Sequence, residues 1–312
     1  MSLHRLLGFD VSVPDPDALA TWYGALGLEG TPNDGYAGGD GGGRVGLDEG
    51  PFRRLVSIHV GADDDRDLEA IARRLADGGA AVERTDEGTV AVVDPATSVR
   101  MRVSAAEPER RGPAVPAPEE ANRPGTTVRA NRRAPGTEAV ARAPRRLGHL
   151  VLGTPDLAAT RSLLVDGLGF KVSDEIDGII SFLRCSTDHH NVALVSSPVP
   201  LLQHYSWECD DLDHVGATAT SVLRRDPDGH VWGIGRHFAG SNFYWYLRDP
   251  SGAFLELYSD LDQITDDEAW ERDGRTEFGL DRIANAWGPE IPLEFIEPAD
   301  LADLQAGWAA RA

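Results

Sequence analysis

Three things are scarce in this sequence: cysteine, basic charge and long apolar runs. Only Cys185 and Cys209 are present among 312 residues, too few for a framework of disulfides. No apolar run reaches the ~18 residues that a membrane-spanning helix needs. The first residues also lack the basic and apolar regions of a secretory signal peptide. We therefore expect a soluble, cytoplasmic protein with reduced thiols.

The shortage of basic residues limits the possible partners. The chain has 30 Lys and Arg against 51 Asp and Glu, a formal net charge of −21. Such a surplus repels the phosphates of nucleic acids and the anionic surface of a membrane, so we expect neither as a partner. We interpret the acidic residues as a solvated surface.

The length and composition leave room for two domains with real cores. Hydrophobic residues make up 41% of the 312 residues. Residues 107–145 interrupt the pattern, because they are rich in Pro, Ala, Arg and Glu and show no sustained apolar period. We expect a linker there, between a domain at residues 1–106 and a domain at residues 146–262, with a tail at residues 263–312. The arginines in and beside the linker are expected to lie in solvent, although contact with the acidic body is the alternative.

The two halves of the chain resemble each other. Residues 7–15 and 147–156 each read as a short apolar strand that leads into a Pro-Asp helix start. Strands are expected to follow at residues 179–185 and 191–196, and the same cycle restarts near Ser57 and near His204. The pattern predicts four units of about 50 residues, each a strand, a helix and three strands, and hence an α+β fold.

Three residues that can bind a metal stand at equivalent places in this repeat. Glu256 lies in an alternating apolar run after an Asp249-Pro250 turn, so a half-buried strand would carry this carboxylate inward. His204 lies 55 residues after His149, and Glu256 lies 52 residues after His204. Two imidazoles and one carboxylate are the ligands of many non-haem Fe(II) oxygenases. We therefore predict a metal site in the second half.

The first half provides an internal control. The positions that match His149, His204 and Glu256 are assigned to Phe9, approximately Ser57, and Met101, which do not form a ligand set. His59 is expected to point to the opposite strand face from Ser57. A purely structural requirement for the three ligands would have applied to both halves, so their absence from the first favours a functional role.

The chain resembles the type I extradiol ring-cleaving dioxygenases of the vicinal oxygen chelate superfamily. The resemblance covers nearly the whole chain. It implies four βαβββ modules in two tandem domains, with the metal in the second. The residues that carry it are Gly148-His149, residues 190–194, His204, the Gly-Arg-His at residues 235–237, Tyr246 nine residues after His237, Asp249-Pro250 leading to Glu256, and the lid-like residues 286–289.

The resemblance also implies roles for individual residues. It places Fe(II), or alternatively Mn(II), on His149, His204 and Glu256. His190 is the implied acid/base residue, because an imidazole can both remove a proton from a catechol hydroxyl and return one during O–O cleavage. Its neighbour His189 is expected to be exposed, since successive side chains on a strand face opposite ways.

Further residues are expected around the metal. His237 and Tyr246 are the implied donors to the substrate oxygens, with Tyr244 as an alternative to Tyr246 on the same strand face. The pocket candidates are Phe182, Trp232 and Trp287. No role is assigned to the remaining histidines, His4, His59, His214 and His230.

The implied substrates are a catechol and O2, and the family forms homo-oligomers. The homoprotocatechuate branch of the family holds its substrate carboxylate with arginines. In this sequence the matching places lie just ahead of the Gly-Arg-His at residues 235–237 and just ahead of the Trp-Gly at residues 287–288. Residues 232–234 and 283–285 carry no arginine here, and Arg282 is offset. Because an unpaired buried carboxylate is costly, we expect a neutral or hydrophobic catechol. The alternatives are a metal-dependent isomerase, epimerase or lyase of the same fold, and a non-catalytic protein that binds aromatic compounds.

Overall fold

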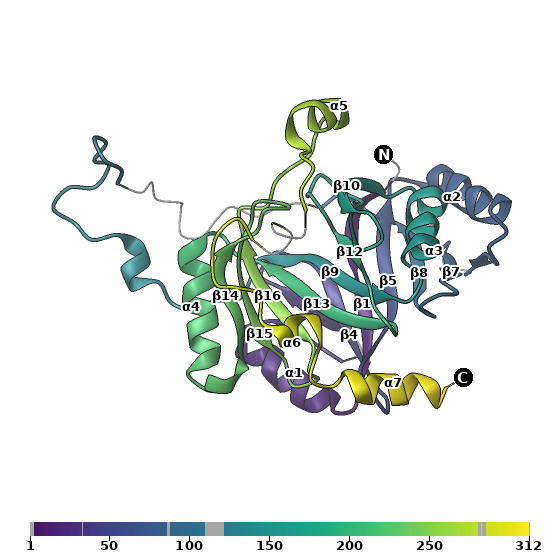
Figure 1. The fold of residues 1–312 in the computed structure, drawn as a ribbon, viewed down its shortest axis with the longest axis horizontal. Helices are drawn as coiled ribbons and strands as arrows, with labels where there is room; N and C mark the ends of the chain where they lie inside the picture. Colours follow the sequence, from purple (N-terminus) through teal and green to yellow (C-terminus); the bar gives the residue numbers. More distant parts are fainter. Residues whose placement is uncertain are drawn as a thin grey trace.

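The chain folds into two eight-stranded sheets, each built from two copies of one strand–helix–three-strand unit (Figure 1). The computed structural model describes residues 3–32, 34–85, 88–109, 122–279, 282 and 285–311. The strands of the second half lie in front of those of the first in Figure 1, with α1 and α4 on one side and α2 and α3 on the other. The predicted α+β fold of four βαβββ modules is confirmed.

The first sheet contains two units. The first unit is β1 (Leu3–Val13), α1 (Pro16–Ala25), β2 (Glu29–Thr31), β3 (Gly35–Gly38) and β4 (Gly41–Glu49). The second unit is β5 (Arg54–Ala62), α2 (Asp65–Asp77), β6 (Glu83–Arg84), β7 (Val90–Val93) and β8 (Arg100–Ala105).

The second sheet contains the other two units and is followed by a tail. The third unit is β9 (Arg146–Thr154), α3 (Leu157–Ser162), the π-helix η2 (Leu163–Leu168), β10 (Lys171–Ile176), β11 (Ile180–Arg184) and β12 (Val192–Ser196). The fourth unit is β13 (Leu201–Glu208), α4 (Leu212–Leu223), η3 (Pro227–Gly229), β14 (His230–Arg236), β15 (Phe243–Arg248) and β16 (Phe254–Ser259). The tail contains α5 (Asp267–Ala269), η4 (Trp270–Gly274), α6 (Leu293–Ile296) and α7 (Leu301–Ala309).

An aspartate starts the helix of every unit. The carboxylates of Asp15, Asp64, Asp156 and Asp211 each accept a hydrogen bond from a backbone N–H of the first helical turn. This cap satisfies one of the N–H groups that a helix leaves unpaired, and it is typically worth about 1 kcal/mol. The repeated Pro-Asp or Asp signal thus fixes where each strand turns into its helix.

The central strands of each sheet place one face toward the apolar core and carry polar side chains on the other. β1 pairs antiparallel with β5 and parallel with β4, and β9 pairs in the same way with β13 and β12. Core-facing residues from both halves form one continuous apolar cluster, in which Phe9 and Tyr205 meet edge to face at 5.5 Å. The opposite face of the second sheet carries the polar residues discussed below.

The strand registers correct the assignment of equivalent positions between the halves. His149 pairs with Ser206 and Ser206 with Glu256, while Gly8 pairs with His59 and His59 with Arg102. The counterparts of His149 and Glu256 are therefore Gly8 and Arg102, one residue away from the predicted Phe9 and Met101. The error arose because the spacing of the signals differs by one residue between the halves. The Leu-Gly pair lies one residue closer to the helix-capping aspartate in the first half, and the Asp-Pro turn lies one residue further from the counterpart of Glu256.

His59 is also placed differently from its prediction. It lies on the same face as Ser57, because residues two apart on a strand point the same way. Its Nε2 lies 2.7 Å from Ser57 Oγ and 3.0 Å from Asp10 Oδ2. The counterpart of His204 is Ser57, as predicted, and Gly8, Ser57 and Arg102 do not form a metal-ligand set.

The connection between the sheets contacts the body more than expected. Part of it, with η1 (Pro135–Glu138), extends outside the sheets (Figure 1), while Arg110 and Arg111 lie outside the described residues. Arg142 pairs with Asp210 at 2.6 Å and Arg145 with Asp40 at 2.9 Å. The expectation of a purely solvated connector is wrong at this end, because the cationic segment runs beside acidic loops of both halves.

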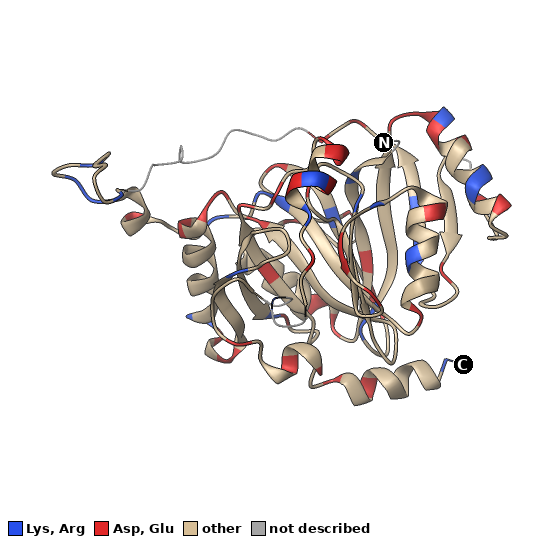
Figure 2. Ribbon diagram, turned by 45° about the horizontal axis from the view of Figure 1, so that its top comes forward, with Lys and Arg blue, Asp and Glu red and all other residues tan. Residues whose placement is uncertain are grey.

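The acidic residues are spread over the helices and loops of both halves rather than gathered in one patch (Figure 2). This distribution agrees with a solvated acidic surface. Among the described residues, no helix is long and apolar enough to cross a membrane.

Tyr205→Phe tests a buried polar chain that joins the halves. Tyr23 donates to the Tyr205 hydroxyl at 3.0 Å, and Tyr205 donates to Asp249 Oδ2 at 2.8 Å. The substitution should lower the free energy of unfolding by about 2 kcal/mol, since a buried acceptor loses its donor. Urea denaturation measures this, with Tyr36→Phe as the control. Equal effects of the two substitutions would contradict the role of the chain.

Candidate metal centre

Three side chains from three neighbouring strands converge at the centre of the second sheet. His149 lies on β9, His204 on β13 and Glu256 on β16, and all three are buried. Ligand atoms from the three side chains all lie within 4.8 Å of one another, and no other such group occurs among the described residues. The structure thus brings together the three residues that the sequence analysis selected.

The strand register explains this convergence. His149, Ser206 and Glu256 form one row across β9, β13 and β16, so their side chains leave the sheet on the same face. His204 precedes Ser206 by two residues and therefore shares that face. The pairing of β13 with β9 is irregular before His204 and again after Ser206. Between these two irregularities the pairing is regular, and His204 and Ser206 both point away from the core.

Glu256 is a fully buried carboxylate held by several partners. Its Oε2 lies 2.8 Å from His149 Nε2 and accepts from Ser206 Oγ at 2.5 Å, while its Oε1 accepts from Asn242 Nδ2 at 2.9 Å. Burial alone would raise the pKa of Glu256, but the electrostatic interaction and the hydrogen bond with His149 outweigh it and hold the pKa well below its usual range. Glu256 is therefore an anion in the interior.

The histidines around it are suited to act as ligands. Burial lowers the pKa of His204 to about 3, only partly opposed by the charge of Glu256, so this imidazole is neutral. His204 Nδ1 donates to Gln203 Oε1, which leaves Nε2 without a proton. A buried anion beside imidazoles with free lone pairs is the donor set of a divalent cation, so these residues fit the implied metal.

His190 and His189 both lie inside the protein. The ring of His190 is 4.1 Å from that of His149. Burial, followed by the neighbouring His149, lowers the pKa of His190 well below its usual value, so it is a neutral imidazole. The expectation that His189 is exposed is wrong, since it is 0% exposed. Strand alternation does not apply here, because both histidines precede β12 in a loop.

His237 and Tyr246 form a pair beside the carboxylate. His237 Nε2 lies 2.9 Å from the Tyr246 hydroxyl and 3.5 Å from Glu256 Oε1. Burial and the charge of Glu256 raise the pKa of Tyr246 well above its usual value, which keeps it a hydroxyl donor. The alternative, Tyr244, instead stacks on His237 and accepts from Asn285 at 3.0 Å.

The three pocket candidates lie in different places. Phe182 meets His190 edge to face at 5.2 Å, in an apolar cluster with Val151 and Ala193. Trp232 is buried and its ring stacks on that of Tyr246 at 5.4 Å, so it helps to fix the orientation of the Tyr246 ring.

Trp287 does not lie at the cluster. It is 51% exposed and packs on Phe243, whose side chain leaves β15 on the face opposite to Tyr244 and Tyr246. A role of Trp287 in the pocket stays a prediction.

The tail supplies a residue that sequence reasoning missed. Phe295 on α6 meets Tyr246 edge to face at 4.7 Å, and its ring is 5.8 Å from that of His204. Gln203 Nε2 donates to the backbone oxygen of Phe295 at 2.9 Å. The side-chain amide that holds His204 thus also holds the tail over the site.

Other contributors were missed for different reasons. Ser206 and Asn242 hydrogen-bond Glu256 directly. Ser206 could have been found, because it follows His204 by two residues on the same strand. Asn242 carries no comparable signal.

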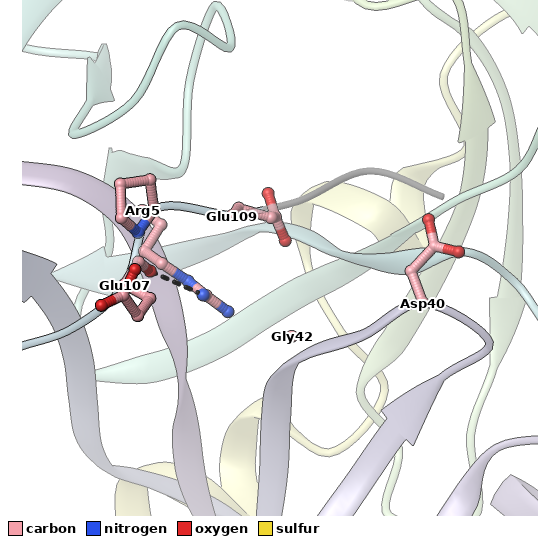
Figure 3. A pocket seen from close by; sticks show the side chains of 6 residues that line it. Arg5, Asp40, Gly42, Glu107 and Glu109 are labelled. Atoms are coloured by element: carbon pink, nitrogen blue, oxygen red, sulfur yellow. Dashed lines mark hydrogen bonds between the residues drawn. The ribbon is translucent and has the colours of Figure 1, made fainter. Parts of the chain in front are cut away.

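A separate charged cavity of about 450 Å3 is lined by Arg5, Asp40, Gly42, Glu107, Pro108 and Glu109 (Figure 3). Arg5 donates to the backbone oxygen of Glu107 at 3.1 Å. The cavity shares no residue with the metal-ligand cluster.

Comparison with known proteins matches the second half of the chain. The model of the Glyoxalase/Bleomycin resistance protein/Dioxygenase superfamily matches residues 146–257. "Metapyrocatechase 2" of Cupriavidus necator is 35% identical over 157 residues, covering 49% of this chain and 47% of that protein. "2,2',3-Trihydroxybiphenyl dioxygenase" of Sphingomonas paucimobilis is 31% identical over 154 residues, covering 47% and 50%. The matches thus span about half the length of these curated relatives.

A solved structure extends the likeness to the whole fold. Homoprotocatechuate 2,3-dioxygenase from Brevibacterium fuscum superposes with a TM-score of 0.73 at 19% identity, covering 96% of this chain and 92% of that chain. At this identity the likeness shows the fold alone. The chain therefore has the tandem glyoxalase-like fold, and residues 146–257 match the Glyoxalase/Bleomycin resistance protein/Dioxygenase superfamily.

Proposed function

We propose that the protein is an extradiol dioxygenase, which opens a catechol ring beside the diol with O2 and places both oxygen atoms in the product. The observation that carries this is the grouping of a buried two-histidine, one-carboxylate cluster with His190 and the His237–Tyr246 pair. The similarity to "Metapyrocatechase 2" over half of the chain supports the same conclusion.

Fe(II) is the proposed metal, with Mn(II) as the alternative, and His149, His204 and Glu256 would hold it. The bound ion would supply a template for catechol and O2 and a path for electrons between them. Neutral His204 and anionic Glu256 are already in the protonation states that metal binding requires.

The surrounding side chains would handle protons and orientation. His190 is neutral and lies against His149, so it can accept a proton from a catechol hydroxyl and return it to the opening ring. Tyr246 keeps its hydroxyl proton and, with His237, can donate hydrogen bonds to the substrate oxygens.

The walls favour a neutral or hydrophobic catechol. Val151, Phe182 and Ala193 form an apolar surface beside His190, and Phe295 closes the opposite side near Tyr246. Apolar walls suit an aromatic ring and disfavour an unpaired carboxylate.

Nearby arginines have other partners. Arg248 pairs with Glu294, Arg236 pairs with Asp260 at 2.5 Å, and Arg282 lies over the ring of Phe238. Among the predicted substrate-contacting stretches, Ile283 and Ala284 lie outside the described residues. The placement of these arginines supports a substrate without a carboxylate.

An isomerase or lyase of the same fold would not need His190, His237 and Tyr246 together, and a non-catalytic binder would not need the ligand cluster. The homo-oligomeric state and the cytoplasmic location stay predictions of the sequence.

Metal binding is the first test. Anaerobic titration of the metal-free protein with Fe(II) or Mn(II), followed by calorimetry, should give one ion per chain and a rise in Tm. Glu256→Gln should weaken binding at least about 100-fold, because the buried anion is lost. Asp10→Asn, in the polar cluster of the first half, is the matched control and should bind like the unsubstituted protein. Two ions per chain, or unchanged binding by Glu256→Gln, would contradict the assignment.

Catechol turnover is the second test. The Fe(II)-loaded protein should consume O2 and form a yellow ring-opened product with 3-substituted or biaryl catechols. We expect kcat/KM for 2,3-dihydroxybiphenyl to exceed that for 3,4-dihydroxyphenylacetate at least about 100-fold, the cost of burying an unpaired carboxylate. A preference for the carboxylated catechol would refute the substrate assignment. Stoichiometric metal without any turnover would favour an isomerase.

A further inference from the structure

A buried hydrogen-bonded chain leads from His190 away from the metal-ligand cluster. His190 Nδ1 lies 3.0 Å from His189 Nδ1, and His189 Nε2 lies 2.9 Å from Asp174 Oδ2. All three side chains are buried, with Asp174 6% exposed. No role for Asp174 or His189 follows from the metal-ligand cluster itself, because neither belongs to it.

The chemistry of the chain selects one tautomer for each ring. A carboxylate oxygen only accepts, so His189 Nε2 carries the proton and donates it to Asp174. With the proton of its ring on Nε2, His189 offers Nδ1 as the acceptor for His190 Nδ1–H. His190 is consequently left with Nε2 as its free acceptor nitrogen. The direction of every hydrogen bond is therefore set by Asp174, at the end of the chain farthest from the metal ligands.

The surroundings hold this chain in place from several elements. The backbone N–H of His189 donates to the Asp262 carbonyl at 2.9 Å, and Trp270 in the tail meets the His189 ring edge to face at 5.4 Å. The preceding residue, Asp188, forms a bidentate pair with Arg146 at 2.8 and 3.0 Å. These contacts restrict rotation of the His189 side chain. A residue that positions another side chain must itself be held in this way.

We propose that Asp174 and His189 are positioning residues that hold His190 in its Nδ1–H tautomer, with Nε2 free to accept a proton from the substrate. This proposal rests on the proposed acid/base function of His190. Asp174 and His189 act through His190 and touch neither substrate nor metal. A residue that only filled space could be replaced by an apolar side chain of similar size. The proposed role instead requires a hydrogen-bond acceptor at position 174 and, at position 189, a group that both accepts and donates a hydrogen bond.

Four substitutions separate these possibilities. Asp174→Asn offers an amide N–H that can donate to His189 Nε2, which would reverse the chain and move the His190 proton to Nε2. His189→Phe keeps an aromatic ring but removes both nitrogens. His189→Gln can still accept from His190 and donate to Asp174 with its amide. Glu175→Gln removes the neighbouring carboxylate of β10, which pairs with Arg161, and is the matched control.

The first readout does not depend on activity. Nitrogen-15 NMR of the metal-free protein reports which ring nitrogen of His190 carries the proton. We expect Nδ1–H in the unsubstituted protein, in His189→Gln and in Glu175→Gln, and a shift toward Nε2–H in Asp174→Asn. An Nε2–H tautomer in the unsubstituted protein, or no change in Asp174→Asn, would overturn the proposal.

The second readout is steady-state kinetics of the Fe(II)-loaded enzyme. Asp174→Asn and His189→Phe should lower kcat about 10- to 100-fold with KM nearly unchanged, the range typical for loss of an outer hydrogen-bond partner. His189→Gln should retain most of kcat. His214→Asn removes another buried histidine, near Asp210 at 3.4 Å, and controls for loss of stability.

Each outcome decides the proposal. Full kcat in His189→Phe, or a loss in folded His189→Gln equal to that in His189→Phe, would overturn it. If His189→Phe does not fold, Asp174→Asn and His189→Gln still decide it through the tautomer. If the unsubstituted enzyme turns over no catechol, the proposed function fails, whereas the NMR result still tests the tautomer.

Discussion

The site depends on one electrostatic constraint, the fully buried carboxylate of Glu256. An ionised carboxylate in the interior costs several kcal/mol unless its neighbours compensate. Here His149, Ser206 and Asn242 contact it, and none of these groups carries a permanent positive charge. A divalent cation would complete the compensation, and this is why the cluster is better explained as a metal site than as a structural network.

The repeated fold makes this constraint possible only in the second half. Both sheets bring three central strands together in the same register, so both offer a place for three side chains on one face. In the first half that place holds Gly8, Ser57 and Arg102, and the nearby Asp10 and His59 satisfy each other. The tail then contacts the second half, where Phe295 and Trp270 pack against residues beside the cluster. The same architecture thus carries the candidate metal-ligand set in the second half only.

The sequence was sufficient for features that depend on local pattern. The Asp helix caps, the strand alternation and the spacing of His149, His204 and Glu256 predicted the four units and the cluster. The equivalent positions in the first half were wrong by one residue, because the spacing from the Leu-Gly pair to the first helix and from the Asp-Pro turn to the last strand differs by one residue between the halves. His189, Asp174 and Phe295 were not predictable, because their contacts come from a loop, an edge strand and the tail. The position of Trp287 could not be predicted either, since the side from which a tail residue packs on the sheet is a property of tertiary structure.

The proposed chemistry requires that both atoms of one O2 molecule enter the same ring-opened product. The most direct measurement is a reaction of the Fe(II)-loaded protein with 2,3-dihydroxybiphenyl under 18O2, followed by mass spectrometry of the product. We predict a ring-opened product that carries label from both atoms, before any exchange with water. This prediction follows from the metal-ligand cluster together with His190 and the His237–Tyr246 pair. A product without label, or an isomerised catechol formed without O2 uptake, would contradict the assignment of this protein as an extradiol dioxygenase.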